Sequence, residues 1–123
     1  MNFLAVFLGG GIGAILRYAL TILSIRYFSF SIYGTFVANI VGCFLIGYVW
    51  GIAFYKTDLI NPIIKTFLTI GFLGGLTTFS TFSIEAFGFL KDGKIVLSFA
   101  YIFVSMISAL FATYLGFLCS KQI

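Results

Sequence analysis

The residues with the most chemistry to offer lie at 74–83, in the run Gly-Gly-Leu-Thr-Thr-Phe-Ser-Thr-Phe-Ser, with Glu85 close behind. Five hydroxyl residues fall within seven positions shortly after two glycines. Glycine weakens a helix and hydroxyl side chains compete for its backbone hydrogen bonds, so we expect a helix to break here. Backbone groups that a break leaves unbonded must be satisfied by protein, water or an ion. The run is therefore a candidate ion site, where freed carbonyls could hold a cation.

Phe79 and Phe82 lie three residues apart after the expected break and so share one helical face. The chain contains 17 phenylalanines, so packing would explain any single ring. These two rings stand among Ser80, Thr81 and Ser83, one turn before an acidic side chain. Aromatic edges carry partial positive charge, so inward-facing rings can stabilise a small anion without a fixed counter-charge that would trap it.

An asparagine and a threonine share a helical stripe in an earlier segment, Gly34-Thr35-Phe36-Val37-Ala38-Asn39, which Gly42 follows. A buried amide is costly unless it is hydrogen-bonded, and its NH₂ group offers two donors. Asn39 either joins two helices or lines a polar path beside Thr35, and we favour the path. Gly34, Ala38 and Gly42 form a small-residue stripe suited to close helix contact.

A single cation interrupts the first apolar segment, where Arg17 follows the pair Gly9 and Gly13. The GxxxG spacing of the glycines predicts close approach of another helix. A guanidinium at that depth must find an acceptor, extend to the membrane surface or face water. A structural role for Arg17 is at least as plausible as direct contact with a ligand.

These side chains must be positioned by long apolar segments, because 62% of the 123 residues are hydrophobic and 8% are charged. In ordinary soluble domains roughly 45–50% of the residues are apolar and about 25% are charged. The charges leave room for stretches of about 20 apolar residues, which is enough to cross a bilayer. We therefore predict an all-α membrane protein that forms a single transmembrane domain, with a broken third helix. The expected spans lie near 3–23, 33–54, 63–89 and 96–118.

The basic residues of the loops are balanced between the two sides of the membrane. Arg26, Lys91 and Lys94 flank one side, and three further lysines flank the other, namely Lys56, Lys65 and Lys121. The positive-inside rule orients helical proteins by an excess of basic residues, and here there is none. This balance either reflects the small number of charges or indicates dual topology, in which oppositely inserted copies pair as an antiparallel homodimer.

Several functions are disfavoured by the composition. The net charge of +4 is spread thinly over the loops, so no basic patch for nucleic acid is expected. Cys43 and Cys119 have no metal-ligand spacing, and the chain has no histidine. It also lacks a plausible nucleophile and base pair, so an enzyme is not expected.

Taken together, these motifs resemble the Fluc (CrcB) family of fluoride channels, and the likeness covers the whole chain. It rests on the opening from Gly9 to Tyr18 with its arginine, the Gly34 to Gly42 motif, and the run 71–83 with Glu85. The resemblance implies a dual-topology antiparallel homodimer with two fluoride pores, each built from both subunits. It places the protein in the cell inner membrane, where it would export fluoride passively as the membrane potential drives the anion out.

The resemblance also implies roles for individual residues. Phe79 and Phe82 would contact fluoride through their ring edges, and Asn39 would donate a hydrogen bond to it. Main-chain carbonyls of Gly74 and Thr77 from both subunits would hold a structural sodium ion. Hydroxyls including Ser80 and Thr113 would continue the path, with Glu85 toward one end and Tyr101 near the rings. Some members have a serine one turn before Thr113, where this chain has Ala109, which puts the fourth-helix part of the path in question.

Two other functional classes match part of this pattern. Small proton-coupled multidrug exporters have a similar length, four spans and dual topology, but they depend on a glutamate in the first helix. Residues 1–25 contain no acidic side chain. A purely structural subunit would leave Asn39, the broken third span and Glu85 unexplained, because polar groups are costly in a bilayer.

Overall fold

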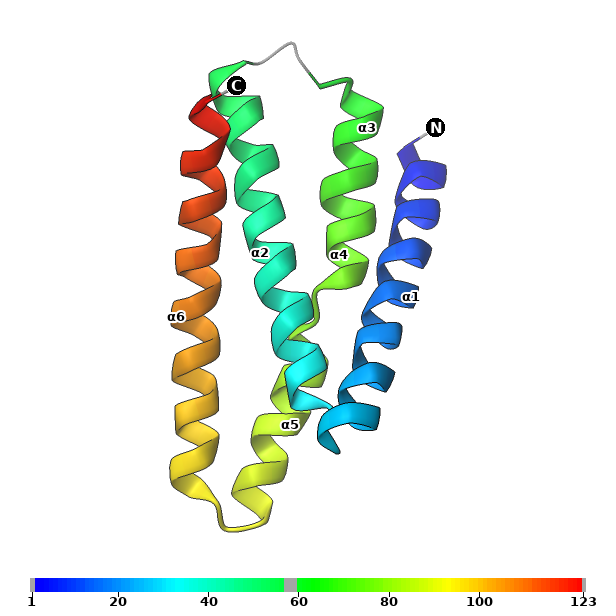
Figure 1. Ribbon diagram of the computed structural model, residues 1–123. Helices are drawn as coiled ribbons and strands as arrows, with labels where there is room; N and C mark the ends of the chain where they lie inside the picture. Colours follow the sequence, from blue (N-terminus) through cyan, green and yellow to red (C-terminus); the bar gives the residue numbers. More distant parts are fainter. Residues whose placement is uncertain (1, 57–59, 123) are drawn as a thin grey trace.

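The computed structural model describes residues 2–56 and 60–122, which form helices joined by short links (Figure 1). Four long helical units run roughly alongside one another. The elements in chain order are α1 (Asn2–Phe28), α2 (Ile32–Tyr55), α3 (Pro62–Thr66), η1 (Phe67–Phe72), α4 (Leu73–Leu76), α5 (Phe79–Lys91), α6 (Ile95–Cys119) and η2 (Ser120–Gln122).

All four units are long and apolar enough to cross a membrane, which confirms the predicted all-α architecture with four spans. The candidate spans are Asn2–Phe28, Ile32–Tyr55, Pro62–Lys91 and Ile95–Gln122. At 1.5 Å per residue, even the shortest, with 24 residues, reaches about 36 Å, more than the roughly 30 Å of bilayer hydrocarbon.

The third span is broken at Thr77 and Thr78, as the sequence predicted. Thr77 has φ −83° and ψ 152°, and Thr78 has φ −149° and ψ 123°, so two extended residues separate α4 from α5. Upstream, the segment Phe67–Phe72 winds as a π-helix, which the sequence did not predict. Such wide turns are often found near functional sites.

Small residues bring the helices close together. A Cβ atom on Gly13 of α1 would collide with the carbonyl of Phe72, and one on Gly116 of α6 would collide with the carbonyl of Phe44 on α2. The predicted approach of another helix to the first-span glycines is therefore confirmed. Apolar helices in lipid gain little from the hydrophobic effect when they associate, so close backbone packing supplies much of the attraction between them.

The link between α1 and α2 and the link between α5 and α6 lie at one end of the bundle. The start of α1, the ends of α2 and α6 and the start of α3 lie at the other (Figure 1). The break between α4 and α5 lies between these two ends, beside α2 (Figure 1). Polar residues at the break are thus placed at an intermediate depth of the bundle.

Candidate functional site

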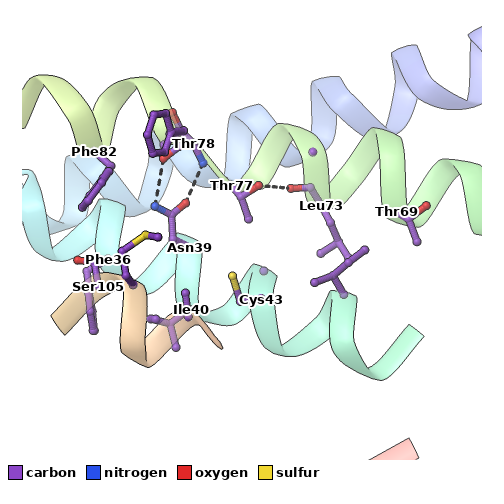
Figure 2. A pocket seen from close by; sticks show the side chains of 16 residues that line it. Phe36, Asn39, Ile40, Cys43, Thr69, Leu73, Thr77, Thr78, Phe82 and Ser105 are labelled. Carbon is purple, nitrogen blue, oxygen red and sulfur yellow. Dashed lines mark hydrogen bonds between the residues drawn. The ribbon is translucent and has the colours of Figure 1, made fainter. Parts of the chain in front are cut away.

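The side-chain amide of Asn39 is paired at both ends with the backbone of Thr78. Its Oδ1 accepts a hydrogen bond from the Thr78 amide at 2.7 Å, and its Nδ2 donates to the Thr78 carbonyl at 3.1 Å (Figure 2). Asn39, in the first half of α2, thereby fixes the extended residue at the break. An NH₂ group has two hydrogens, so Asn39 can make one further donation.

This pairing changes the hydrogen bonding of the carbonyls around the break. In a continuous helix the Thr78 amide would bond to the Gly74 carbonyl, but here it donates to Asn39. The Thr81 amide likewise donates to Oγ1 of Thr78, at 3.2 Å, and not to the Thr77 carbonyl. The carbonyls of Gly74 and Thr77 have therefore lost their usual helical donors. Unwound backbone carbonyls of this kind are typical ligands of Na⁺ in membrane proteins.

Arg17, on α1, contacts the break from the other side. Its Nε donates to the carbonyl of Gly75 at 3.1 Å. A cation at this depth can bind an acceptor, extend to the membrane surface or face water. The structure shows the first, because Arg17 donates to a backbone carbonyl. The side chain therefore stabilises the end of α4.

A cavity of about 340 Å³ adjoins the break and is lined by α2, η1, α4, α5 and α6. Among the residues that the structure describes, the lining includes no lysine, arginine, aspartate or glutamate. Side chains that face it include Asn39, Thr77 and Ser105 (Figure 2). The full lining consists of Phe36, Asn39, Ile40, Gly42, Cys43, Ile46, Thr69, Leu73, Gly74, Thr77, Thr78, Phe79, Phe82, Ser105, Met106 and Ala109.

The two phenylalanines after the break belong to a chain of aromatic contacts. The ring centroids of Phe79 and Phe82 are 5.8 Å apart, and those of Phe82 and Tyr101 are 5.2 Å apart. Both pairs are tilted, at 45° and 48°, which allows a ring edge to face a neighbour. Phe82 is 7% exposed, whereas Phe79 is 75% exposed. The Phe79 ring therefore forms part of the cavity wall, and most of its surface is exposed in this single chain.

Glu85 lies beyond these rings and accepts three hydrogen bonds from hydroxyl groups. Its Oε1 accepts from Ser31 at 2.7 Å and from Thr35 at 2.9 Å, and its Oε2 accepts from Tyr101 at 2.8 Å. Hydrogen bonds to a charged acceptor are stronger than neutral ones, so they offset part of the cost of placing a carboxylate here. Thr35 is 1% exposed, and its hydroxyl donates to Glu85. Thr35 does not line the cavity described above.

Two candidate residues, Ser80 and Thr113, do not line the cavity. The Oγ of Ser80 is 3.2 Å from the Oγ1 of Thr78, at the start of α5. Thr113 donates to the carbonyl of Ala109 at 3.0 Å. It lines a separate hollow with Ile46, Gly47, Trp50, Leu110, Tyr114 and Phe117. The structure thus brings most of the candidates together at the break and leaves Thr113 outside the lining of the cavity.

Two serines of the site were not among the candidates chosen from the sequence. Ser105 lies on α6, and its Oγ is buried without a hydrogen-bond partner in the part of the chain that the structure describes. It faces the cavity, so it can donate to a bound ion (Figure 2). Ser31 precedes the second span, and only the fold brings it to Glu85.

Comparison with known proteins finds relatives that align with nearly the full length of this chain. Residues 4–117 match a family model described as CrcB-like protein, Camphor Resistance (CrcB). The fluoride-specific ion channel FluC of Desulfotalea psychrophila is 40% identical over 122 residues, which cover 99% of this chain and 94% of the relative. The protein of the same name from Pyrococcus horikoshii is 42% identical over 115 residues, which cover 94% and 92% of the two chains.

Proposed function

This chain belongs to the CrcB family, whose relatives are fluoride-specific ion channels, and from that premise we propose how it carries fluoride across a membrane. The observation that supports the path is the helix break, where Asn39, the freed backbone groups and the cavity meet. The fluoride ion passes through this region by exchanging its water for donors on the protein. The whole chain acts as one transmembrane domain.

The donors around the cavity suit a small, strongly hydrated anion. Asn39 has a second N–H to offer, Ser105 has a buried hydroxyl, and the edges of Phe79 and Phe82 carry partial positive charge. The described residues of the cavity lining include no cationic side chain, so the ion is stabilised without being trapped. Chloride is larger and gains less from close hydrogen-bond donors, which favours fluoride.

Hydroxyl groups on either side of the rings continue the path. Ser80 lies at the start of α5, and Thr35 and Tyr101 surround the carboxylate of Glu85 toward one end. Thr113 would extend the path on α6, although in this chain Ala109 stands one turn before it. These residues guide the anion between the central cavity and the water at the membrane surface.

A structural sodium ion fits the carbonyl groups at the break. Gly74 and Thr77 would hold it through their main-chain oxygens, because the amides that would bond these oxygens in a helix donate to Asn39 and Thr78. When bound, the ion supplies positive charge that stabilises the break. The third carbonyl of this region, that of Gly75, accepts from Arg17 and is less available.

The working unit is an antiparallel homodimer of oppositely inserted copies, with two pores. Two observations support this assembly. The loops at the two ends of the bundle carry balanced basic charge, three residues against three. Phe79 is 75% exposed at the edge of the cavity, so a second copy can complete the wall. The symmetry axis of such a pair lies in the membrane plane.

In the cell inner membrane this channel exports fluoride. Hydrogen fluoride enters as a neutral molecule and dissociates in the more alkaline cytoplasm, and the membrane potential drives the anion outward. The channel lowers the cytoplasmic concentration of fluoride and its toxicity without a coupled energy source.

Fluoride efflux from liposomes tests this function. Vesicles that contain the purified protein and are loaded with potassium fluoride should release fluoride rapidly when valinomycin is added, whereas chloride-loaded vesicles should release little. Slow, saturable efflux that requires a proton gradient would indicate a proton-coupled exporter and would contradict the channel. Protein-free vesicles give the background leak.

A further inference from the structure

Ser31 stands at the N-cap position of α2 but does not cap that helix. Serine is a preferred N-cap because its oxygen can accept from the second or third amide of the helix. Here Ser31 has helical backbone angles, φ −74° and ψ −26°, and no capping hydrogen bond from its side chain. Its hydroxyl instead donates to Oε1 of Glu85, at 2.7 Å and 54 residues away in the sequence.

A serine of the preceding helix takes over the capping role. The amide of Gly34, the third residue of α2, donates to Oγ of Ser24 at 3.0 Å, and the same hydroxyl donates to the carbonyl of Phe30. Ser24 is 5% exposed, so these bonds are shielded from water. A side chain near the end of α1 thus accepts the hydrogen bond of an amide at the start of α2. The Ser31 hydroxyl is therefore available for Glu85.

The carboxylate is held from two directions. Ser31, the N-cap of α2, and Thr35, one turn later, both donate to Oε1, while Tyr101 of α6 donates to Oε2. In this arrangement Glu85 does not line the central cavity, and the Phe82 ring, in contact with Tyr101, lies at its wall. The negative charge is therefore held beside the proposed path and outside the cavity.

We infer that Ser31 is a positioning residue that keeps the Glu85 carboxylate out of the way of the permeating anion. This inference rests on the proposed fluoride path. A carboxylate that turned toward the cavity would repel fluoride across a medium of low polarity. Loss of one charge-assisted hydrogen bond lowers the ratio of the held to the released conformation about tenfold. Ser24 supports the same arrangement by making a cap from Ser31 unnecessary.

Fluoride efflux from liposomes tests the role through three variants. Ser31→Ala should lower efflux by up to that factor, and Ser31→Thr, which keeps the hydroxyl, should restore it. Ser120→Ala is the matched control, because Ser120 is buried and donates only to the carbonyl of Phe117 in the adjoining helix. Unchanged efflux in Ser31→Ala, or an equal loss in Ser31→Thr, would overturn the inference.

A double variant separates positioning from a general structural effect. In the Glu85→Gln background there is no charge to hold aside, so adding Ser31→Ala should change efflux by less than about twofold, because residues that act through one contact have non-additive effects. An equal loss in both backgrounds would show that Ser31 acts through the fold and would reject the role.

Infrared spectroscopy gives a measurement that does not depend on conduction. The chain has only three acidic side chains, so the carboxylate stretching band of Glu85 can be assigned by its loss in Glu85→Gln. Removing the Ser31 donor should shift this band, and Ser120→Ala should leave it in place. An unshifted band in Ser31→Ala would reject the contact even if no variant conducts. If the wild-type protein does not conduct fluoride, the proposed function fails independently of this band.

Discussion

Nε of Arg17 donates to the carbonyl of Gly75 across 58 residues of sequence, so the first span is joined to the end of α4 by a charge-assisted hydrogen bond. The positive charge lies where the helical segment that began at Pro62 presents its unbonded carbonyls. Gly75 also packs so closely on α1 that an added Cβ would meet the carbonyl of Gly10. The break is thus braced by α1 on one side and by Asn39 of α2 on the other.

Removing the Arg17 contact should destabilise the protein. Arg17→Gln is expected to lower the free energy of unfolding by about 1.5–3 kcal/mol, the range for hydrogen bonds to charged groups. Thermal unfolding in detergent measures the effect. Arg26→Gln serves as the control because Arg26 is exposed in the last turn of α1. Equal melting temperatures for the two variants would contradict a bracing role.

Changing Asn39 to aspartate should separate its two contacts. An aspartate can still accept from the Thr78 amide, but it loses the donor to the Thr78 carbonyl and brings a negative charge to the cavity. We expect an intact fold by size-exclusion chromatography and fluoride efflux close to background. Asn61→Asp is the matched control, since the Asn61 side chain caps α3 by accepting from the Ile63 amide and does not line the cavity. Normal efflux from Asn39→Asp would rule out a donor role toward fluoride.

The rings at the cavity should be essential for conduction but not for folding. Phe79→Ile or Phe82→Ile replaces a ring edge of partial positive charge with an aliphatic group, so fluoride efflux should fall by at least about tenfold, which corresponds to 1.4 kcal/mol. Phe87→Ile on the same helix is the comparison, because Phe87 is 57% exposed and lines no part of the cavity. If all three variants conduct equally, the two rings play no special part.

Close packing of α6 on α2 should make Gly116 intolerant of a side chain. Gly116→Ala forces a Cβ onto the Phe44 carbonyl and is expected to cost about 1–3 kcal/mol of stability. Gly88→Ala provides the contrast, because a Cβ at Gly88 has no neighbour within 4 Å and alanine favours a helix by up to about 1 kcal/mol. Melting temperatures should therefore move in opposite directions.

Balanced loop charges predict insertion in both orientations. A reporter fused to the C-terminus should be labelled from both faces of the membrane in the wild-type protein. Adding two lysines at the α5–α6 link, next to Gly93, should bias the chain toward one orientation, since basic residues favour the cytoplasmic side. A wild-type reporter confined to one face would exclude the antiparallel assembly.

Much of the architecture follows from local properties of the sequence. The four apolar helices follow from hydropathy and length, and the structure confirms them. The break after Gly75 follows from glycines and hydroxyl side chains that compete with helical hydrogen bonds, and it lies at Thr77 and Thr78. Each of these features depends on neighbours within a few turns, so no knowledge of distant partners is needed.

The partners within the site were decided by the tertiary structure. Asn39 joins Thr78, Arg17 joins Gly75 and Ser31 joins Glu85, across 39, 58 and 54 residues of sequence. Helical periodicity predicts which face a residue occupies, but the rotation and axial offset between two helices determine which groups meet. These offsets depend on where small residues allow the backbones to approach, as at Gly13 and Gly116. The sequence by itself therefore located the break, whereas only the packing of the helices decided which side chains bond across it.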